Sequence, residues 1–189
     1  MLVEDEVDAL PVGLRAKLLR LLATIQTYGL TEIREPHVKH LDGKLWELRV
    51  SAPEGLARAI YVTMTGRRVI VLHVSEKKTQ KTPQRAISLA FGADERGEMM
   101  ATLAELLAKN MKDPEFAAAY AEADAEYSVI EAMLGARIAA GLTQAEVAVR
   151  AGTTQSAIAR LEGGSVSPTV ETLRKYAKAV GKRLRVEMV

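Results

Sequence analysis

Residues Leu142–Gly164 read LTQAEVAVRAGTTQSAIARLEGG, and this stretch predicts two short helices joined by a tight turn. Thr143 is placed to cap the first helix, and Glu146, three residues later, completes a capping box. Gly152 is placed to adopt the positive φ angle of the turn. The cap of the second helix is predicted at Thr153 or Thr154. The spacing therefore predicts a helix-turn-helix.

The two predicted helices have an inner and an outer face. Side chains expected to point into a core are Ala145, Val147, Ala148, Ile158 and Leu161. The outer face of the second helix keeps Gln155, Ser156 and Arg160, whose amide, hydroxyl and guanidinium groups suit base edges in a major groove. The segment resembles the Cro/repressor-type (XRE) helix-turn-helix, which favours DNA binding over an ordinary pair of packed helices.

Length and composition limit the class of protein. The 189 residues suffice for one large or two small domains, and the chain has no cysteine, which excludes disulfides and cysteine zinc sites. The acidic start MLVEDEVDALP is unlike a signal peptide, and no apolar run reaches membrane-spanning length. We expect a cytoplasmic protein without a cofactor. His37 and His40 have no carboxylate at metal-ligand spacing, so we expect no metal site, and His73 is expected to be a core residue.

The net charge of +2 conceals three segments of different sign. Residues 1–92 hold 14 basic and 10 acidic side chains, residues 93–132 hold 3 and 10, and residues 133–189 hold 9 and 4. The net charges are therefore +4, −7 and +5. Basic segments attract phosphate backbones. The acidic segment is the natural candidate to lie over the basic first half.

The first half predicts an α+β domain. Leucines at helical spacing predict a helix from Leu14 to Ile25 that ends at Tyr28-Gly29 and is followed by a loop to about His40. Three strands are predicted, over Lys44–Val50, Ala57–Met64 and Arg67–Val74. Thr65-Gly66 marks a hairpin turn, and the apolar run Val69–Val74 predicts a central strand. A closing helix is expected from Thr82 to Ala90.

The second half predicts an all-α domain. A helix beginning near Leu103 is broken by Asp113-Pro114, and a long alanine-rich helix runs from Glu115 to about Ala140. After the helix-turn-helix, one more helix ends at Gly181. The alternating tail Lys182–Met188 predicts a short strand that pairs with a second copy or closes its own domain.

The run KKTQKTP, Lys77–Pro83, follows a predicted buried strand and places positive charge at a sheet edge. Arg49, Arg58 and Tyr61 come from neighbouring strands. Such a cluster suits RNA cleavage without a metal, because Lys and Arg stabilise the charge of a pentacoordinate phosphate and a tyrosine or lysine moves protons. On charge alone, a solvated basic face is the stronger interpretation.

The order of these features resembles the HigB-like branch of the RelE toxin superfamily over about Ala9 to Ala90. The resemblance implies a small antiparallel sheet backed by helices and ribosome-dependent mRNA cleavage. It implies an RNA-contacting, catalytic set of Arg49, Arg58, Tyr61, Lys77, Lys78 and Lys81. Family members usually begin with a strand and a longer first helix, so residues 1–92 are expected to form an N-terminally truncated toxin domain.

From about residue 101 to 189 the chain resembles a HigA-type antitoxin, with the XRE helix-turn-helix at about 133–181 and residues 93–100 as the junction. Such antitoxins bind the cognate toxin and repress their own promoter as dimers. The resemblance implies base contacts by Gln155, Ser156 and Arg160, and phosphate contacts by Gln144 and Thr154. A homodimer on a palindromic operator and a toxin–antitoxin contact in cis or trans follow from it.

Three hypotheses remain open. The first is a toxin–antitoxin fusion that acts as a DNA-binding autorepressor, with the RNase-like half neutralised in cis or degenerate. The second is an active mRNA endonuclease, acting on the ribosome, that is released by cleavage near Gly92–Met99. The third is an XRE regulator whose first half serves only oligomerisation or ligand sensing.

Overall fold

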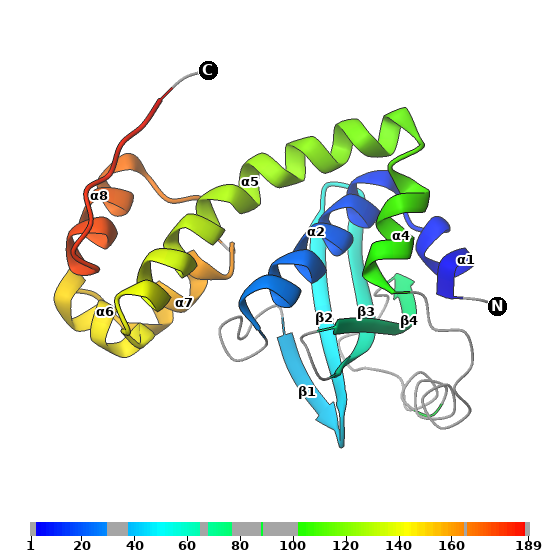
Figure 1. The fold of residues 1–189 in the computed structure, drawn as a ribbon, viewed down its shortest axis with the longest axis horizontal. Coiled ribbons are helices and arrows are strands. Elements are labelled where there is room, and N and C mark those ends of the chain that lie inside the picture. The colour runs from blue at the N-terminus through cyan, green and yellow to red at the C-terminus, as the bar shows by residue number, and fades with distance from the viewer. Residues whose placement is uncertain are drawn as a thin grey trace.

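A computed structural model describes residues 3–29, 38–64, 68–76, 88, 102–164 and 166–187. Figure 1 shows a lobe of sheet and helices, a lobe of short helices, and one long helix that belongs to both. The elements are α1 (Val3–Asp8), α2 (Val12–Tyr28), β1 (Val38–Asp42), β2 (Leu45–Ala52), β3 (Gly55–Met64), β4 (Arg68–Glu76), α4 (Leu103–Asn110), α5 (Pro114–Ala139), α6 (Gln144–Ala151), α7 (Gln155–Glu162) and α8 (Val170–Ala179).

The described strands form one antiparallel sheet in the order β1-β2-β3-β4. Alternation along β2 places Leu48 and Val50 in the core beneath α2, and Leu45 in a second apolar cluster on the opposite face. The expected antiparallel sheet with helices is therefore confirmed. The predicted loop before His40 is partly wrong, because β1 begins at Val38.

Strand β4 is the last strand of the described sheet, with an isolated antiparallel bridge between Ile70 and Thr102 beside it. Among the described strands, the prediction of a central strand is therefore wrong. The apolar run has another cause: both faces of β4 contribute to apolar clusters, with Val71 on one side and Leu72 on the other. The short helix α1, which the sequence did not predict, packs along this edge. Its Glu6 Oε2 accepts a hydrogen bond from the Val74 N–H at 2.8 Å, which satisfies a donor that an edge strand leaves unpaired.

The main apolar core crosses the predicted junction. It joins α2 and the sheet to α4 and to α5 along most of its length, through Leu103, Leu106, Phe116, Tyr127, Ile130 and Leu134. Phe116 and Leu106 are both 0% exposed. The arm formed by α4 and α5 therefore completes the core of the N-terminal lobe.

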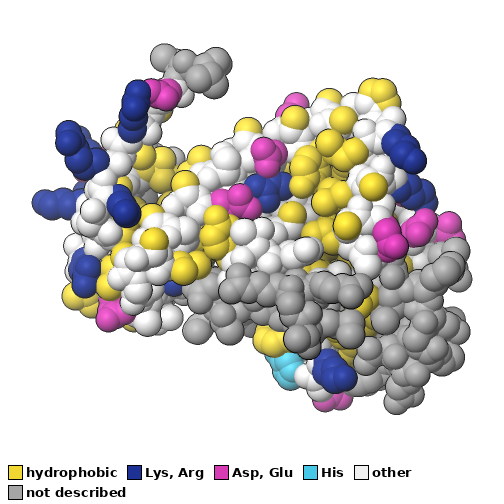
Figure 2. Space-filling model, viewed as in Figure 1, with side chains coloured by type: hydrophobic (Ala, Val, Ile, Leu, Met, Phe, Trp, Pro, Cys, Tyr) yellow, Lys and Arg dark blue, Asp and Glu magenta, His cyan; other side chains and the backbone are white. Residues whose placement is uncertain are grey.

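Opposite charges line the contact between α2 and α5. The Arg20 guanidinium donates to Asp124 Oδ1 at 2.6 Å and to Glu131 Oε1 at 2.7 Å. Lys17 Nζ lies 2.8 Å from Glu126 Oε2. Figure 2 shows acidic and basic side chains side by side along this part of the surface. The expectation that the acidic segment lies over the basic half is confirmed for these residues.

A second, smaller core holds α6, α7 and α8 against the last turns of α5. Its members include Met133, Val147, Ile158 and Tyr176. The predicted all-α organisation of this lobe is confirmed, as is the break at Asp113-Pro114, where Asp113 caps α5. Residues 182–187 lie in no helix or strand of this single chain. The alternative in which the terminal strand closes its own domain is therefore wrong for these residues, and pairing with a second copy stays a prediction. None of the helices in the described ranges is long and apolar enough to cross a membrane.

Candidate nucleic-acid interface

Helices α6 and α7 meet at the turn that the sequence predicts. The Thr143 side chain accepts from the Glu146 N–H and the Glu146 side chain accepts from the Thr143 N–H, so the capping box is present. These hydrogen bonds from Thr143 lower the pKa of Glu146. Gly152 has φ +66°, and Thr154, rather than Thr153, caps α7. The local signals thus fix the geometry of the helix-turn-helix.

The outer face of α7 is available to a partner. Gln155, Ser156 and Arg160 are exposed, whereas Ile158 is 1% exposed and Leu161 is 9% exposed. The three polar side chains are spaced at positions i, i+1 and i+5, so they lie on one side of the helix over its first turns. An exposed helix with this face fits a major groove.

Gln144 does not lie where the predicted phosphate contact needs it. It is 9% exposed, and its Nε2 donates to Glu162 Oε2 at 3.0 Å. The neighbouring Ala145, predicted to face the core, is exposed instead. One residue along a helix is a rotation of about 100°, so burying Gln144 turns Ala145 outward. Thr154 remains exposed, with its Oγ1 accepting the cap bond from the Ala157 N–H.

A buried polar network joins the second-lobe helices, and the sequence interpretation missed it. Glu162, 2% exposed, accepts from Arg137 Nε at 2.8 Å and from the Tyr176 hydroxyl at 2.5 Å. Arg137 also donates to the Leu142 carbonyl at 3.1 Å. Burial, with the Glu162 charge beside it, raises the pKa of Tyr176. The network fixes α7 relative to α5 and α8, so the exposed face of α7 has a set orientation.

In the N-terminal lobe, Arg49 and Arg58 are cross-strand partners on the face of the sheet away from α2. Between them lies Glu47, which is 0% exposed. Its Oε1 accepts from Arg49 Nε at 2.8 Å and from Arg58 Nε at 2.6 Å. Glu47 has the same strand parity as Arg49, so the alternation could have revealed it. A buried carboxylate thus neutralises part of the charge of this pair.

Tyr61 is separated from the arginine pair, so its predicted membership of that cluster is wrong. It lies three residues from Arg58, an odd number, and alternation places it on the opposite face, in the core beneath α2. It is 0% exposed, and burial raises the pKa of its hydroxyl. Lys77, Lys78 and Lys81, and the helix predicted from Thr82, lie outside the described residues.

The described histidines have structural partners. His73 Nδ1 lies 2.9 Å from Glu6 Oε1, as expected of a satisfied, partly buried residue. His40 Nε2 lies 3.0 Å from the Gly43 carbonyl oxygen, and its ring packs edge-on against Trp46. His37 is outside the described residues. Among the side chains that the structure describes, no group of three His, Cys, Asp or Glu is placed to hold a metal ion.

Two different family models match this chain, one in each lobe. Residues 5–93 match the family model described as phage-derived protein Gp49-like (DUF891), and residues 136–186 match the model described as helix-turn-helix. Two curated relatives, both named Antitoxin HigA1, come from the CDC 1551 / Oshkosh and ATCC 25618 / H37Rv strains of Mycobacterium tuberculosis. Each is 32% identical over 74 residues, 39% of this chain. The match covers 50% of each relative's own length, so the chain spans about half the length of these relatives.

Proposed function

We propose that this chain is a toxin–antitoxin fusion that binds a specific operator and represses its own promoter. The exposed face of α7 is the observation that supports it most directly. Gln155 and Ser156 lie in the first turn of that helix and Arg160 one turn further, and all three are exposed on the side away from the apolar core of the second lobe. The helix-turn-helix match and the similarity to proteins named as antitoxins support the same function.

In this proposal, the arm formed by α4 and α5 holds the Gp49-like lobe in cis. The arm packs against α2, on one side of the sheet, and Arg49 and Arg58 lie on the other side. The arm would then act on the lobe as a whole rather than by covering the arginine pair. Because the two partners belong to one chain, their effective concentration is high and the contact persists on dilution.

The test of operator binding begins with selection of duplex DNA from a randomised pool by the full chain. Anisotropy titrations then compare the selected duplex with a scrambled one. Arg160→Ala should cost about 1–3 kcal/mol on the selected duplex and less on the scrambled one. Lys39→Ala, an exposed cation on β1 in the other lobe, is the matched control and should bind like the parent. If Arg160→Ala retains both affinity and selectivity, the assignment of the recognition helix is wrong.

A homodimer on a palindromic operator is part of the proposal. It places two copies of α7 about 34 Å apart, one turn of the duplex. The selected sequences should therefore contain two inverted half-sites with that separation. Sedimentation of the complex with a duplex of one and of two half-sites measures the stoichiometry directly.

The second candidate function, an mRNA endonuclease, is favoured by one observation. The Arg49 side chain is 28% exposed on the face of the sheet opposite to the arm, and a guanidinium is suited to contact a phosphate. The test places a specific protease site between Gly92 and Met99 in the full chain and follows growth and mRNA integrity after cleavage in cells. Growth arrest of cells with the cleaved parent, but not with the cleaved Arg49→Ala variant, supports this function. Unchanged growth with parent and variant excludes it.

A further inference from the structure

The C-terminal tail, residues 182–187, has no partner strand among the described residues. Its last backbone hydrogen bond in the described part of the chain runs from the Lys182 N–H to the Ala177 carbonyl oxygen, at 2.8 Å. Figure 1 shows the tail as a red trace that passes α8 and ends clear of the other elements. Val186 is 64% exposed. The backbone groups that follow Lys182 can therefore pair with another chain, as those of an edge strand can.

The tail already has the side-chain arrangement of a strand. Arg185 and Glu187, two positions apart, form an ion pair with each other. Side chains at positions i and i+2 lie on one side of an extended chain, whereas in a helix they do not face each other. Leu184 and Val186 therefore share the opposite side, where Leu184 is half-buried and Val186 is exposed. The tail thus presents one charged and one apolar side, which is typical of a half-buried strand.

We propose that the tails of two copies pair as antiparallel strands, with Val186 opposite the partner's Val186. In this register each Arg185 lies opposite the partner's Glu187, so the charges of the two copies are complementary. A centre at Arg185 would place two guanidinium groups opposite each other, and a centre at Leu184 would place Arg183 opposite the partner's Arg185. Like charges directly opposite destabilise a sheet. A centre between two residues would set the charged side against the apolar side, so the pattern selects Val186.

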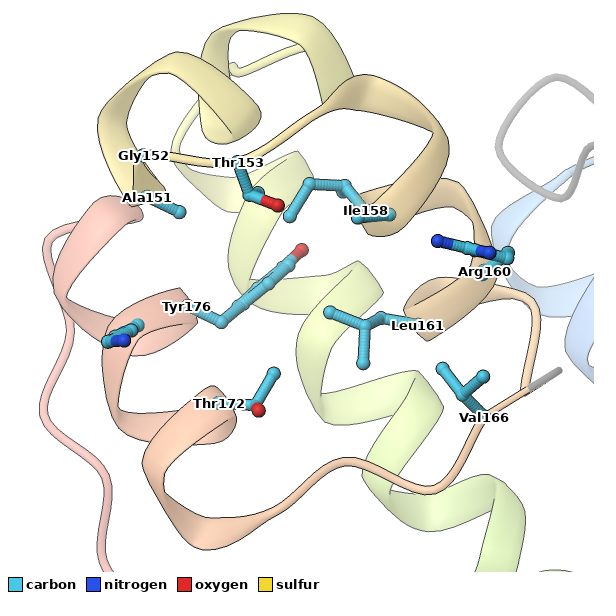
Figure 3. Close-up of a pocket in the computed structure, with 11 residues that line it drawn as sticks. Ala151, Gly152, Thr153, Ile158, Arg160, Leu161, Val166, Thr172 and Tyr176 are labelled. Atoms are coloured by element: carbon cyan, nitrogen blue, oxygen red, sulfur yellow. The ribbon is translucent and has the colours of Figure 1, made fainter.

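The proposed pairing leaves the outer face of α7 clear. In Figure 3 the tail, drawn in faint red, lies beyond α8 from Arg160. Two strands of this length are only marginally stable on their own, so we expect a weak dimer in the absence of DNA. The consequence for the operator rests on the proposed function: two copies on neighbouring half-sites hold their tails at high effective concentration, and tail pairing then makes their binding cooperative.

The test introduces single cysteines into the full chain, which contains none. Val186→Cys places two thiols directly opposite each other, close enough for a disulfide. Arg183→Cys is the matched control: it is also an exposed tail position, but in this register it lies six residues along the strand from its own copy, about 20 Å away. Under oxidation without DNA, Val186→Cys should form the linked dimer about tenfold faster than Arg183→Cys, because only its thiols meet disulfide geometry.

Charge reversal in the Val186→Cys chain tests the register. Arg185→Glu places two carboxylates opposite each other and should slow formation of the disulfide about three- to tenfold. The further exchange Glu187→Arg restores opposite charges across the pair and should restore the rate. Arg183→Glu is the matched control: it adds the same charge to the tail but faces no charged side chain in this register, so the rate should stay that of the unreversed chain.

The outcomes are separate from those of operator binding, because every cross-linking measurement is made without DNA. Equal rates for Val186→Cys and Arg183→Cys indicate random collision and overturn the pairing. A rate that falls with Arg185→Glu but does not recover with Glu187→Arg overturns the register. Weaker DNA binding by Arg185→Glu with an unchanged cross-linking rate assigns the tail to the phosphate backbone and also overturns the pairing. Cross-linking specific to Val186→Cys in a chain that selects no duplex supports the pairing and refutes only the operator proposal.

Discussion

Arg20→Met tests whether the arm stabilises the N-terminal lobe through its charges. Arg20 is 7% exposed, and its guanidinium reaches Asp124, Glu131 and the Thr24 hydroxyl. It also lies over the Tyr127 ring, 5.8 Å from the centroid. Methionine keeps an apolar stem of similar length, so the variant removes the charge and its hydrogen bonds with little loss of packing.

The expected loss of unfolding free energy is about 2–3 kcal/mol. Removing one partner of a fully buried ion pair costs about 3–5 kcal/mol. The cost is lower here because the Asp124 side chain is 56% exposed and that of Glu131 is 23% exposed, so water can hydrate both carboxylates. Lys17→Met is the matched control: its pair with Glu126 is more exposed, at 27% and 46%, and should be worth less than about 1 kcal/mol.

The assay is urea unfolding of the full chain, followed by fluorescence of Trp46 and by far-ultraviolet circular dichroism. Trp46, the single tryptophan, packs against the core that the arm completes. For Arg20→Met, a loss of 2–3 kcal/mol lowers the urea midpoint by about 1 M. If Arg20→Met and Lys17→Met differ by less than about 0.5 kcal/mol, the buried network does not stabilise the contact between arm and lobe.

Four further variants test the remaining interactions. Glu162→Gln leaves a buried guanidinium without its carboxylate and should cost about 3 kcal/mol in chemical unfolding; a neutral result would contradict the assigned network. Gly152→Ala, at φ +66°, should lose about 1–2 kcal/mol of unfolding free energy. Gly135→Ala should gain up to about 1 kcal/mol, because its Cβ would meet only the Tyr28 side chain, at 3.5 Å from the hydroxyl oxygen and 3.8 Å from Cε1. The reverse order of the two variants would refute both expectations. The hydrogen bond from Arg20 lowers the pKa of Glu131 below its ordinary 4.5. The ionised Glu131 therefore contributes its full stabilisation of the folded state above pH 4.5, and this contribution is lost as the pH falls through the lowered pKa. The stability difference between parent and Glu131→Gln should therefore shrink from pH 5 to pH 3, and a constant difference would exclude this linkage.

Local signals in the sequence predicted the second lobe well. A capping box needs only Thr143 and Glu146, and a left-handed turn needs only Gly152, so these features follow from residues that are close in the chain. The long helix α5 is likewise delimited by Asp113-Pro114 and by the turn before Leu142. Such elements depend little on what packs against them.

Features that depend on distant partners were predicted poorly. The apolar run of β4 indicated a central strand. The edge of β4 is instead covered by α1, whose Glu6 accepts a hydrogen bond from the Val74 N–H. Gln144 was expected at a DNA phosphate, but its partner Glu162 lies 18 positions further along the chain. Tyr61 is a different case, because strand parity alone already separates it from Arg58.

The sharing of α5 between the two cores restricts how this chain can change in length. Ile130 and Leu134 pack into the N-terminal core and Met133 into the C-terminal core, all within about one helical turn. One inserted residue between Ile130 and Met133 would rotate the helix-turn-helix by about 100° and displace it by about 1.5 Å relative to the sheet. Ile130 and Leu134 would then lie on opposite sides of the insertion, so they could not both keep their contacts in the N-terminal core. We therefore expect substitutions on either side of this turn to be tolerated more readily than insertions or deletions within it.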